Sequence, residues 1–274
     1  MDRERLRALA QETVEIGRAG RYTVDGQVIQ LDAVRPTELW TAEELDRLVQ
    51  ETELPAEGPS AAIEVRGEGT VDAIFRLSGG ARLCPELGVL NFASAKNPGG
   101  GFLNGSVAQE ECLAFCSDLY QTQTTGQGPR YYEINRAVRD PVYTDTMLIG
   151  DVTFFRTSGF SLTAAPVTCP AITAPAVNMG IVVRNGDSVD RAKQVMKGRM
   201  EKILALFAGW GCTRLVLGAY GCGVFRNDPE DVARSWQELL EGSGWGRLFE
   251  QVSFSILERP GRDGNIVPFR RRFG

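Results

Sequence analysis

The chain has 274 residues, 43% of them hydrophobic and 24% charged, which fits a globular protein with one large domain or two small ones. No apolar run approaches the roughly 20 residues of a membrane helix, and the charged N-terminus contains no apolar signal segment. The net charge of −5 does not favour wholesale capture of nucleic acid, so we expect a cytoplasmic monomer with no membrane contact and no direct DNA binding.

The absence of histidine excludes several chemistries at once. Neither a Ser-His-Asp or Cys-His catalytic group nor a His-ligated metal centre can form. The six cysteines include no C-x-x-C pair, and we expect reduced thiols rather than a disulfide framework or a zinc site. Acid–base chemistry must therefore come from carboxylates, Lys, Tyr or Cys.

The first 55 residues are predicted to form a mainly helical extension packed on the main domain. The elements expected here are a helix over 2–18, a strand-like piece at 22–31 and a helix over 41–52. Thr41 caps the second helix and Glu44 completes its capping box. Because the stretch 54–60 is rich in Pro and Gly, it is predicted to be a linker, and the catalytic domain is assigned to 56–274.

Strands and helices alternate from residue 61 onward. The predicted strands are 61–66, 88–93, 146–155, 161–169, 213–219 and 251–257. The predicted helices begin at Ser106, span 187–207 and run from Asp228 to Leu240, while 70–77 is helical or extended and the proline-rich 170–177 is a loop. This alternation predicts an α/β fold with three layers, αβα, around a mostly parallel mixed sheet.

Two glycine-rich loops, 97–105 and 218–223, each follow a buried strand and precede a helix. Ligands of such sheets bind beyond the carboxyl ends of the strands, so we expect both loops at one edge, lining a cleft with free backbone N–H groups. The second loop is either a structural turn or a phosphate-binding nest at a helix N-terminus. It matches neither a Walker loop nor the dinucleotide G-x-G-x-x-G pattern.

The helix after the first loop opens with two adjacent glutamates. Ser106 fits as its N-cap with Gln109 completing a capping box, which places Glu110 and Glu111 in the first turn. A glutamate pair in the first turn of a helix is often simply solvent-exposed and stabilised by the helix dipole. Adjacent helical residues point about 100° apart, so the two carboxylates cannot flank one bond; one holds the substrate while the other transfers protons. A general acid near neutral pH needs burial and the like-charged neighbour to outweigh the helix dipole.

At these positions the sequence resembles a known family. Three glycines, seven further residues and then Gln109-Glu110-Glu111 resemble the signature of poly(ADP-ribose) glycohydrolases, and the context NFASAKNPGGGFLNGSVAQEE is similar to the bacterial type. The second loop, GCGVF at 221–225, resembles the diphosphate loop of macrodomains, the fold that these enzymes use. The resemblance covers about residues 60–258.

The resemblance implies hydrolysis of ribose–ribose O-glycosidic bonds at chain ends of poly(ADP-ribose), with ADP-ribose as product and no metal or organic cofactor. It implies Glu111 as the proton-transferring residue and Glu110 as the residue that orients the riboses. The implied ligand-binding set is Asn97, Gly99, Gly100, Gly101, Gln109, Gly221, Cys222, Gly223, Val224 and Phe225. Within it, the first loop lines the distal ribose and diphosphate, the second cradles the diphosphate, and Phe225 packs on the terminal ribose.

Two alternatives stay open at this point. The chain could bind ADP-ribose without cleaving it, or it could remove mono(ADP-ribose) from ADP-ribosylated proteins. Candidates for holding the adenine are Phe269 and Tyr22.

Overall fold

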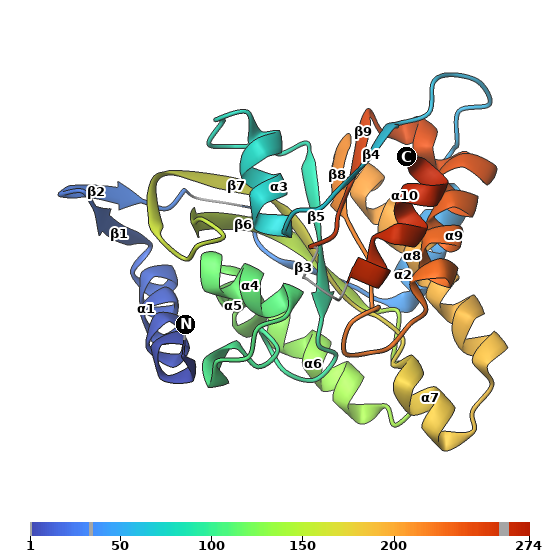
Figure 1. Ribbon diagram of the computed structural model, residues 1–274, viewed down its shortest axis with the longest axis horizontal. Coiled ribbons are helices and arrows are strands. Elements are labelled where there is room, and N and C mark those ends of the chain that lie inside the picture. Colours follow the sequence, from blue (N-terminus) through green and yellow to red (C-terminus); the bar gives the residue numbers. More distant parts are fainter. Residues whose placement is uncertain (1, 33–34, 258–262) are drawn as a thin grey trace.

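The computed structural model describes residues 2–32, 35–257 and 263–274, and in this part of the chain seven strands form one mixed sheet (Figure 1). Its order is β3-β6-β7-β5-β8-β9-β4. The strands are β3 (Glu38–Trp40), β4 (Ala62–Arg66), β5 (Leu87–Ala93), β6 (Met147–Arg156), β7 (Leu162–Pro175), β8 (Arg214–Leu217) and β9 (Gln251–Ser255). The five strands from β7 to β4 are mutually parallel, and β6 runs antiparallel to both β7 and β3.

Helices cover both faces of the sheet, which confirms the predicted three-layer arrangement (Figure 1). One layer contains α1 (Arg3–Ala19), α3 (Thr70–Ser78) and α4 (Gln109–Cys116), with α5 (Leu119–Thr124) and α6 (Gly128–Ala137) beside it. The other contains α2 (Ala42–Glu51), α7 (Met179–Asn185), α8 (Val189–Trp210), α9 (Pro229–Gln237) and α10 (Val267–Phe273). The fully buried core is divided between these two layers.

The N-terminal segment joins the same body. Asp2 caps α1 through the Arg5 amide, and the Thr41–Glu44 capping box of α2 forms as predicted. The strand-like piece is a separate hairpin of β1 (Arg21–Val24) and β2 (Gln27–Gln30). Because β3 pairs with β6 and α2 packs on α8, this segment contributes to the main sheet and core. A domain boundary near residue 55 stays a prediction.

The predicted loop at 170–177 is wrong, because β7 continues through it to Pro175. The Thr168 amide donates to the Arg82 carbonyl in the segment that precedes β5, and two residues later the Pro170 nitrogen faces that same side. The ladder with β5 starts only at Ala171. Proline therefore occupies a position where its missing N–H removes no bond of that ladder.

Two predicted helices differ in extent from the structure. The ambiguous stretch 70–77 is the helix α3. The helix capped by Asp228 ends at Gln237 rather than Leu240, and a π-helical turn, Glu238–Gly242, follows it.

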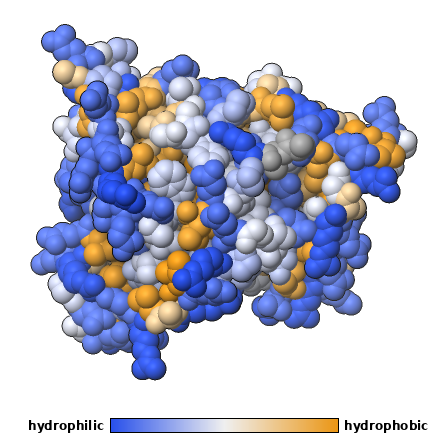
Figure 2. Space-filling view, turned by 180° about the vertical axis from the view of Figure 1, so that it is seen from behind, coloured by the Kyte–Doolittle hydropathy of each residue, from blue (hydrophilic) through white to orange (hydrophobic). Residues whose placement is uncertain are grey.

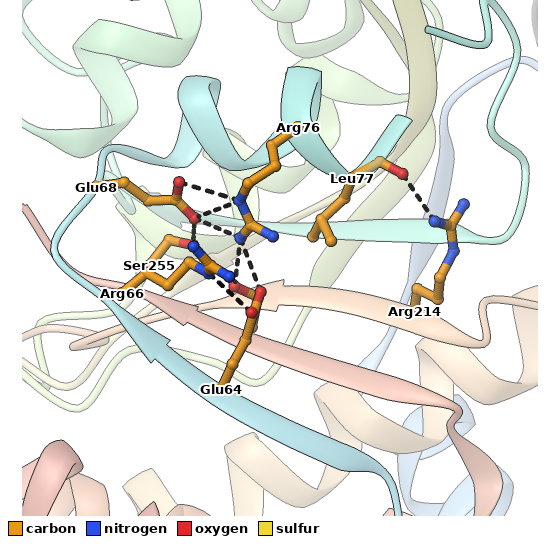
Figure 3. Close-up of polar contacts among 8 residues, drawn as sticks. Glu64, Arg66, Glu68, Arg76, Leu77, Arg214 and Ser255 are labelled. Carbon is orange, nitrogen blue, oxygen red and sulfur yellow. Dashed lines mark hydrogen bonds and ion pairs between the residues drawn. The ribbon is translucent and has the colours of Figure 1, made fainter. Parts of the chain in front are cut away.

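A polar network fastens α3 to the β4 edge of the sheet (Figure 3). Arg76 of α3 contacts Glu64 of β4 at 2.8 Å and Glu68 at 2.5 Å. It also donates to Ser253 of β9 at 3.2 Å. One guanidinium thus joins a helix to two neighbouring strands.

The outer surface is mixed in character. Seen from behind, apolar residues lie in small groups among hydrophilic ones (Figure 2). In the described part of the chain, no helix combines the length and apolarity needed to cross a membrane.

The fully buried Arg199 of α8 joins distant parts of the chain. It donates to Asp145 Oδ1 at 2.8 Å, to the Pro175 carbonyl at 2.7 Å and to the Val142 carbonyl at 2.8 Å. One buried cation therefore holds both the end of β7 and the loop before β6. Removing the Arg199 side chain takes a hydrogen-bond donor away from each of these partners.

Replacing Arg199 by Met should lower the free energy of unfolding by about 3 kcal/mol, because two buried carbonyls lose their donor at about 1–3 kcal/mol each, while Asp145 keeps its ion pair with Lys202. Lys197→Met on the same helix removes an exposed pair with Glu238 and should cost less than about 1 kcal/mol. Urea denaturation measures both. Equal losses for the two variants would contradict the structural role given to Arg199.

Candidate active site

The sheet brings the two glycine loops together as predicted. β5 and β8 are parallel neighbours, with Leu87 opposite Arg214 and Val89 opposite Val216. Their following loops therefore leave the same edge of the sheet, at the end toward which β5 points in Figure 1. α6 and α7 lie along that edge as well.

The start of α4 differs from the predicted capping box. The helix begins at Gln109, so Ala108 is its N-cap and Glu111 its third residue. Glu111 Oε2 accepts the Ala108 amide at 2.9 Å, which is the bond expected of a capping glutamate. Ser106 instead lies beside Gly101, where a Cβ would be 2.6 Å from its Oγ. A 3₁₀ turn, Phe102–Asn104, lies in the loop just before Ser106.

Helix α4 is short and ends at Cys116. The next helix, α5, begins at Leu119. Gln109, predicted to bind ligand, uses its side chain within the protein. Its Oε1 accepts the Phe92 amide at 2.9 Å and its Nε2 donates to the Leu90 carbonyl at 2.9 Å, so it fastens α4 to β5.

Glu110 is buried, with 4% of its surface exposed. Its Oε1 accepts from Asn91 Nδ2 at 3.2 Å and from Gln123 Nε2 at 3.0 Å, and its Oε2 accepts the Ser94 amide at 2.7 Å. Burial raises the pKa of this carboxyl to about 8 and outweighs the three donors, while the neighbouring Glu111 raises it further. Glu110 thus joins β5, Ser94 just after that strand, and α5.

Glu111 is only partly buried, and both of its oxygens are fixed by backbone donors. Oε1 accepts the Gly101 amide at 2.9 Å, in addition to the bond from Ala108. Gly100 passes both glutamates with φ +59°, and a Cβ there would lie 2.5 Å from Glu111 Oε1 and 3.1 Å from Glu110 Oε2. Glycine is required at this position by both its conformation and the close approach.

The first loop uses its own glycine donors. The Gly99 amide donates to Gln123 Oε1 at 2.5 Å, the Gly100 amide to the Asn97 carbonyl at 2.9 Å, and the Gly101 amide to Glu111. The prediction that both loops offer free N–H groups is therefore wrong for these three amides. This loop is instead internally bonded and shaped to hold the glutamates, while Asn97 itself is exposed.

The second loop has the opposite character. In the described part of the chain, the amides of Gly221, Gly223, Val224 and Phe225 have no acceptor. Val224 is 80% exposed, and Cys222 is partly buried with its thiol near the Tyr220 carbonyl. The loop supplies these donors by itself, because α9 begins only at Pro229 and its N-terminus is capped by Asp228. The predicted link to a helix N-terminus is therefore wrong, and the nest of loop amides is what could bind an anion.

The aromatic candidates fall into two groups. Phe225 is partly exposed, and its ring centroid is 6.0 Å from that of Tyr143. Tyr22 packs on Phe155 and donates to the Thr163 carbonyl, whereas Phe269 is fully buried against Phe254. Both adenine candidates therefore lie in packed interiors.

Sequence reasoning missed several residues of the site, namely Asn91, Gln123, Thr173 and Tyr143. Asn91 interrupts the apolar run GVLNFA, and this polar residue in a buried strand was the available signal. Gln123 and Thr173 gave none, since they reach Asn91 and Glu110 only through the fold. Among the described residues, no three Cys, Asp or Glu side chains are grouped as metal ligands.

On a three-layer α/β fold, a glutamate pair next to a loop of open N–H donors combines the acid–base groups and the anion site of a hydrolase for a phosphate-bearing substrate. Residues 10–157 match the catalytic domain of microbial-type poly(ADP-ribose) glycohydrolase (PARG). The chain belongs to this family of microbial-type PARGs.

Solved structures agree with this assignment. The chain is 38% identical to the PARG of Thermomonospora curvata, with a TM-score of 0.92 over 99% of this chain and 100% of that one. The same enzyme bound to the inhibitor ADP-HPD matches with a TM-score of 0.89, 38% identity and the same coverage. The PARG of Deinococcus radiodurans in complex with ADP-ribose is 39% identical, with a TM-score of 0.77 over 86% of this chain and 93% of that one. No curated protein sequence matches the chain.

The raised pKa of Glu110 predicts a pH-dependent stability. The carboxyl titrates near pH 8 when folded and near its ordinary 4.5 when unfolded. Between these values the folded protein holds a proton that the unfolded chain releases. The contribution of Glu110 to stability is therefore complete below about pH 4.5 and is lost as the pH rises through 8.

Relative to Glu110→Gln, the wild-type free energy of unfolding should fall by up to about 2 kcal/mol from about pH 5.5 to about pH 7.5. Glu57→Gln, in the exposed linker, should follow the wild type. Chemical denaturation at both pH values measures the difference. A pH dependence shared by wild type and Glu110→Gln would exclude the raised pKa.

Proposed function

We propose that this protein hydrolyses ribose–ribose O-glycosidic bonds at the chain ends of poly(ADP-ribose) and releases ADP-ribose. The observation that carries the proposal is the Glu111 carboxylate, fixed by two backbone amides beside Gly100, at the same sheet edge as the open amides of the second loop. Membership of the PARG family supports the same substrate. The proposal includes a macrodomain-type fold, a monomer, a cytoplasmic location and no direct DNA binding.

In this proposal the substrate lies across both loops. The open amides of Gly221, Gly223, Val224 and Phe225 cradle the diphosphate, and these neutral donors bind an anion in a chain of net charge −5. The Phe225 ring packs on the terminal ribose. Asn97 and the backbone of Gly99–Gly101 line the distal ribose, where the absence of side chains allows close approach.

Glu111 protonates the departing 2′-oxygen of the penultimate ribose as positive character develops on the terminal ribose. The nearby diphosphate stabilises that oxocarbenium-like state. Glu111, now a carboxylate, then activates a water molecule that attacks the anomeric carbon. Its partial exposure suits it to this role, since Glu110 is buried among protein donors.

Glu110 orients the riboses through the loop that it holds. Burial raises the pKa of this carboxyl to about 8, and its three hydrogen-bond partners are all protein groups, so Glu110 serves position rather than proton transfer. The two glutamates therefore have unequal roles, one for position and one for proton transfer.

Replacing Glu111 by Gln should lower the rate of ADP-ribose release from poly(ADP-ribose) by about 10²–10⁴-fold, because the proton donor is lost. The affinity for ADP-ribose should be retained. Release is measured by chromatography and affinity by calorimetry, with Glu15→Gln on exposed α1 as control. A Glu111→Gln enzyme of near wild-type rate would refute the assignment. A wild-type protein that binds ADP-ribose but does not release it from poly(ADP-ribose) would instead be a binding module.

The substrate class is tested with two modified proteins, one carrying polymer and one carrying single ADP-ribose units. We expect release of ADP-ribose from the polymer, with the protein-linked unit left in place. Gel analysis of the protein and chromatography of the products distinguish the two. Removal of single units at a comparable rate would instead assign the protein as a mono(ADP-ribosyl)-protein hydrolase.

A further inference from the structure

Three residues, Lys96, Arg136 and Tyr143, are linked to Phe225 by a chain of neighbouring contacts, and we call them the basic rim. Arg136 of α6 donates from Nε to the Lys96 carbonyl at 2.8 Å. Lys96 Nζ lies 6.0 Å from the centroid of the Tyr143 ring, which in turn neighbours Phe225. Lys96 lies two residues after Ser94, whose amide donates to Glu110, so the basic rim starts beside the segment that binds Glu110.

The two cations of the basic rim carry uncompensated charge. Lys96 and Arg136 are exposed, and neither forms an ion pair within residues 2–32, 35–257 and 263–274. Their neighbours differ, because Arg130 pairs with Glu133 and Arg191 with Asp140. The chain as a whole is negative, with a net charge of −5. Two neighbouring cations without ion-pair partners beside the site therefore favour an anionic ligand.

Tyr143 is held in a strained conformation at the surface. Its φ of +57° is unusual for a bulky residue. The backbone on either side is fixed by buried groups, since Arg199 donates to the Val142 carbonyl at 2.8 Å and Asn135 accepts the Thr144 amide at 3.1 Å. Strain that the surrounding fold maintains is a mark of functional positions, and here it presents a partly exposed ring.

We propose that the basic rim binds the leaving part of the polymer, an inference that rests on the proposed function. The departing 2′-oxygen belongs to an adenosine, so an adenine and a diphosphate lie directly beyond the bond that is cleaved. The adenine stacks on Tyr143, and Lys96 and Arg136 bind the phosphates. Aromatic rings combined with cations are how proteins hold single-stranded polynucleotides of any sequence, and the position next to Phe225 places both beside the terminal ribose.

The test measures binding in the Glu111→Gln background, so that no substrate is consumed. Dissociation constants are determined for ADP-ribose and for size-fractionated poly(ADP-ribose). Tyr143→Gly, which suits the left-handed backbone, and the pair Lys96→Gln with Arg136→Gln should each weaken polymer binding about tenfold and leave ADP-ribose binding unchanged. The double variant should also flatten the dependence of log affinity on log salt by about 0.7 per lost phosphate contact.

Two controls isolate the ring and the charge. Tyr143→Phe keeps the ring and should bind polymer as the parent does. Arg18→Gln removes one exposed positive charge on α1, away from the site, and should change neither affinity. The Lys96 side chain makes no hydrogen bond within the described residues, so Lys96→Gln alone should fold normally. It therefore tests the basic rim even if Tyr143→Gly fails to fold.

Two results would overturn the inference. Equal weakening of ADP-ribose and polymer binding would place the basic rim in the product site. Unchanged polymer binding would show that the basic rim does not contact the polymer. Failure of the proposed function is a separate result, seen as a wild-type chain that binds polymer without releasing ADP-ribose. The binding comparison remains decisive for the basic rim in that case.

Discussion

A buried carboxyl group is the constraint on which the site depends. Glu110 gathers donors from β5, from Ser94 just after that strand and from α5, and Gln123 extends this set to the Gly99 amide. A buried carboxyl must be either paired or neutral, and this one combines three donors with a raised pKa. The position of Glu111, one residue later on the same helix, follows from where Glu110 is fixed.

The two glycine loops use backbone donors in opposite ways. In the first, the amides of Gly99, Gly100 and Gly101 are consumed by the protein, which makes a rigid support for the glutamates. In the second, the amides of 223–225 stay open. Similar composition therefore serves two purposes, preorganisation of the catalytic group and capture of an anion without a net positive charge.

The packing of α8 extends this organisation to the end of β7 and the loop before β6. Arg199 reaches through the core to the end of β7 and to the loop that carries Tyr143. The same loop is fixed by Asn135 of α6, which also carries Arg136. The basic rim, the second glycine loop and the glutamate pair are thus positioned by elements that share one sheet edge.

The sequence by itself determined the alternation of strands and helices, the caps at Thr41 and Asp228, and the order of glycine loop and glutamate pair, because these depend on local periodicity and backbone preference. It did not determine the start of α4, where two capping patterns overlap, or the path of β7 through Pro170. Tertiary structure alone decided which glycine amides are open and which glutamate is buried. Those properties depend on partners such as Gln123 and Thr173, which become neighbours of Glu110 and Asn91 only when the chain folds.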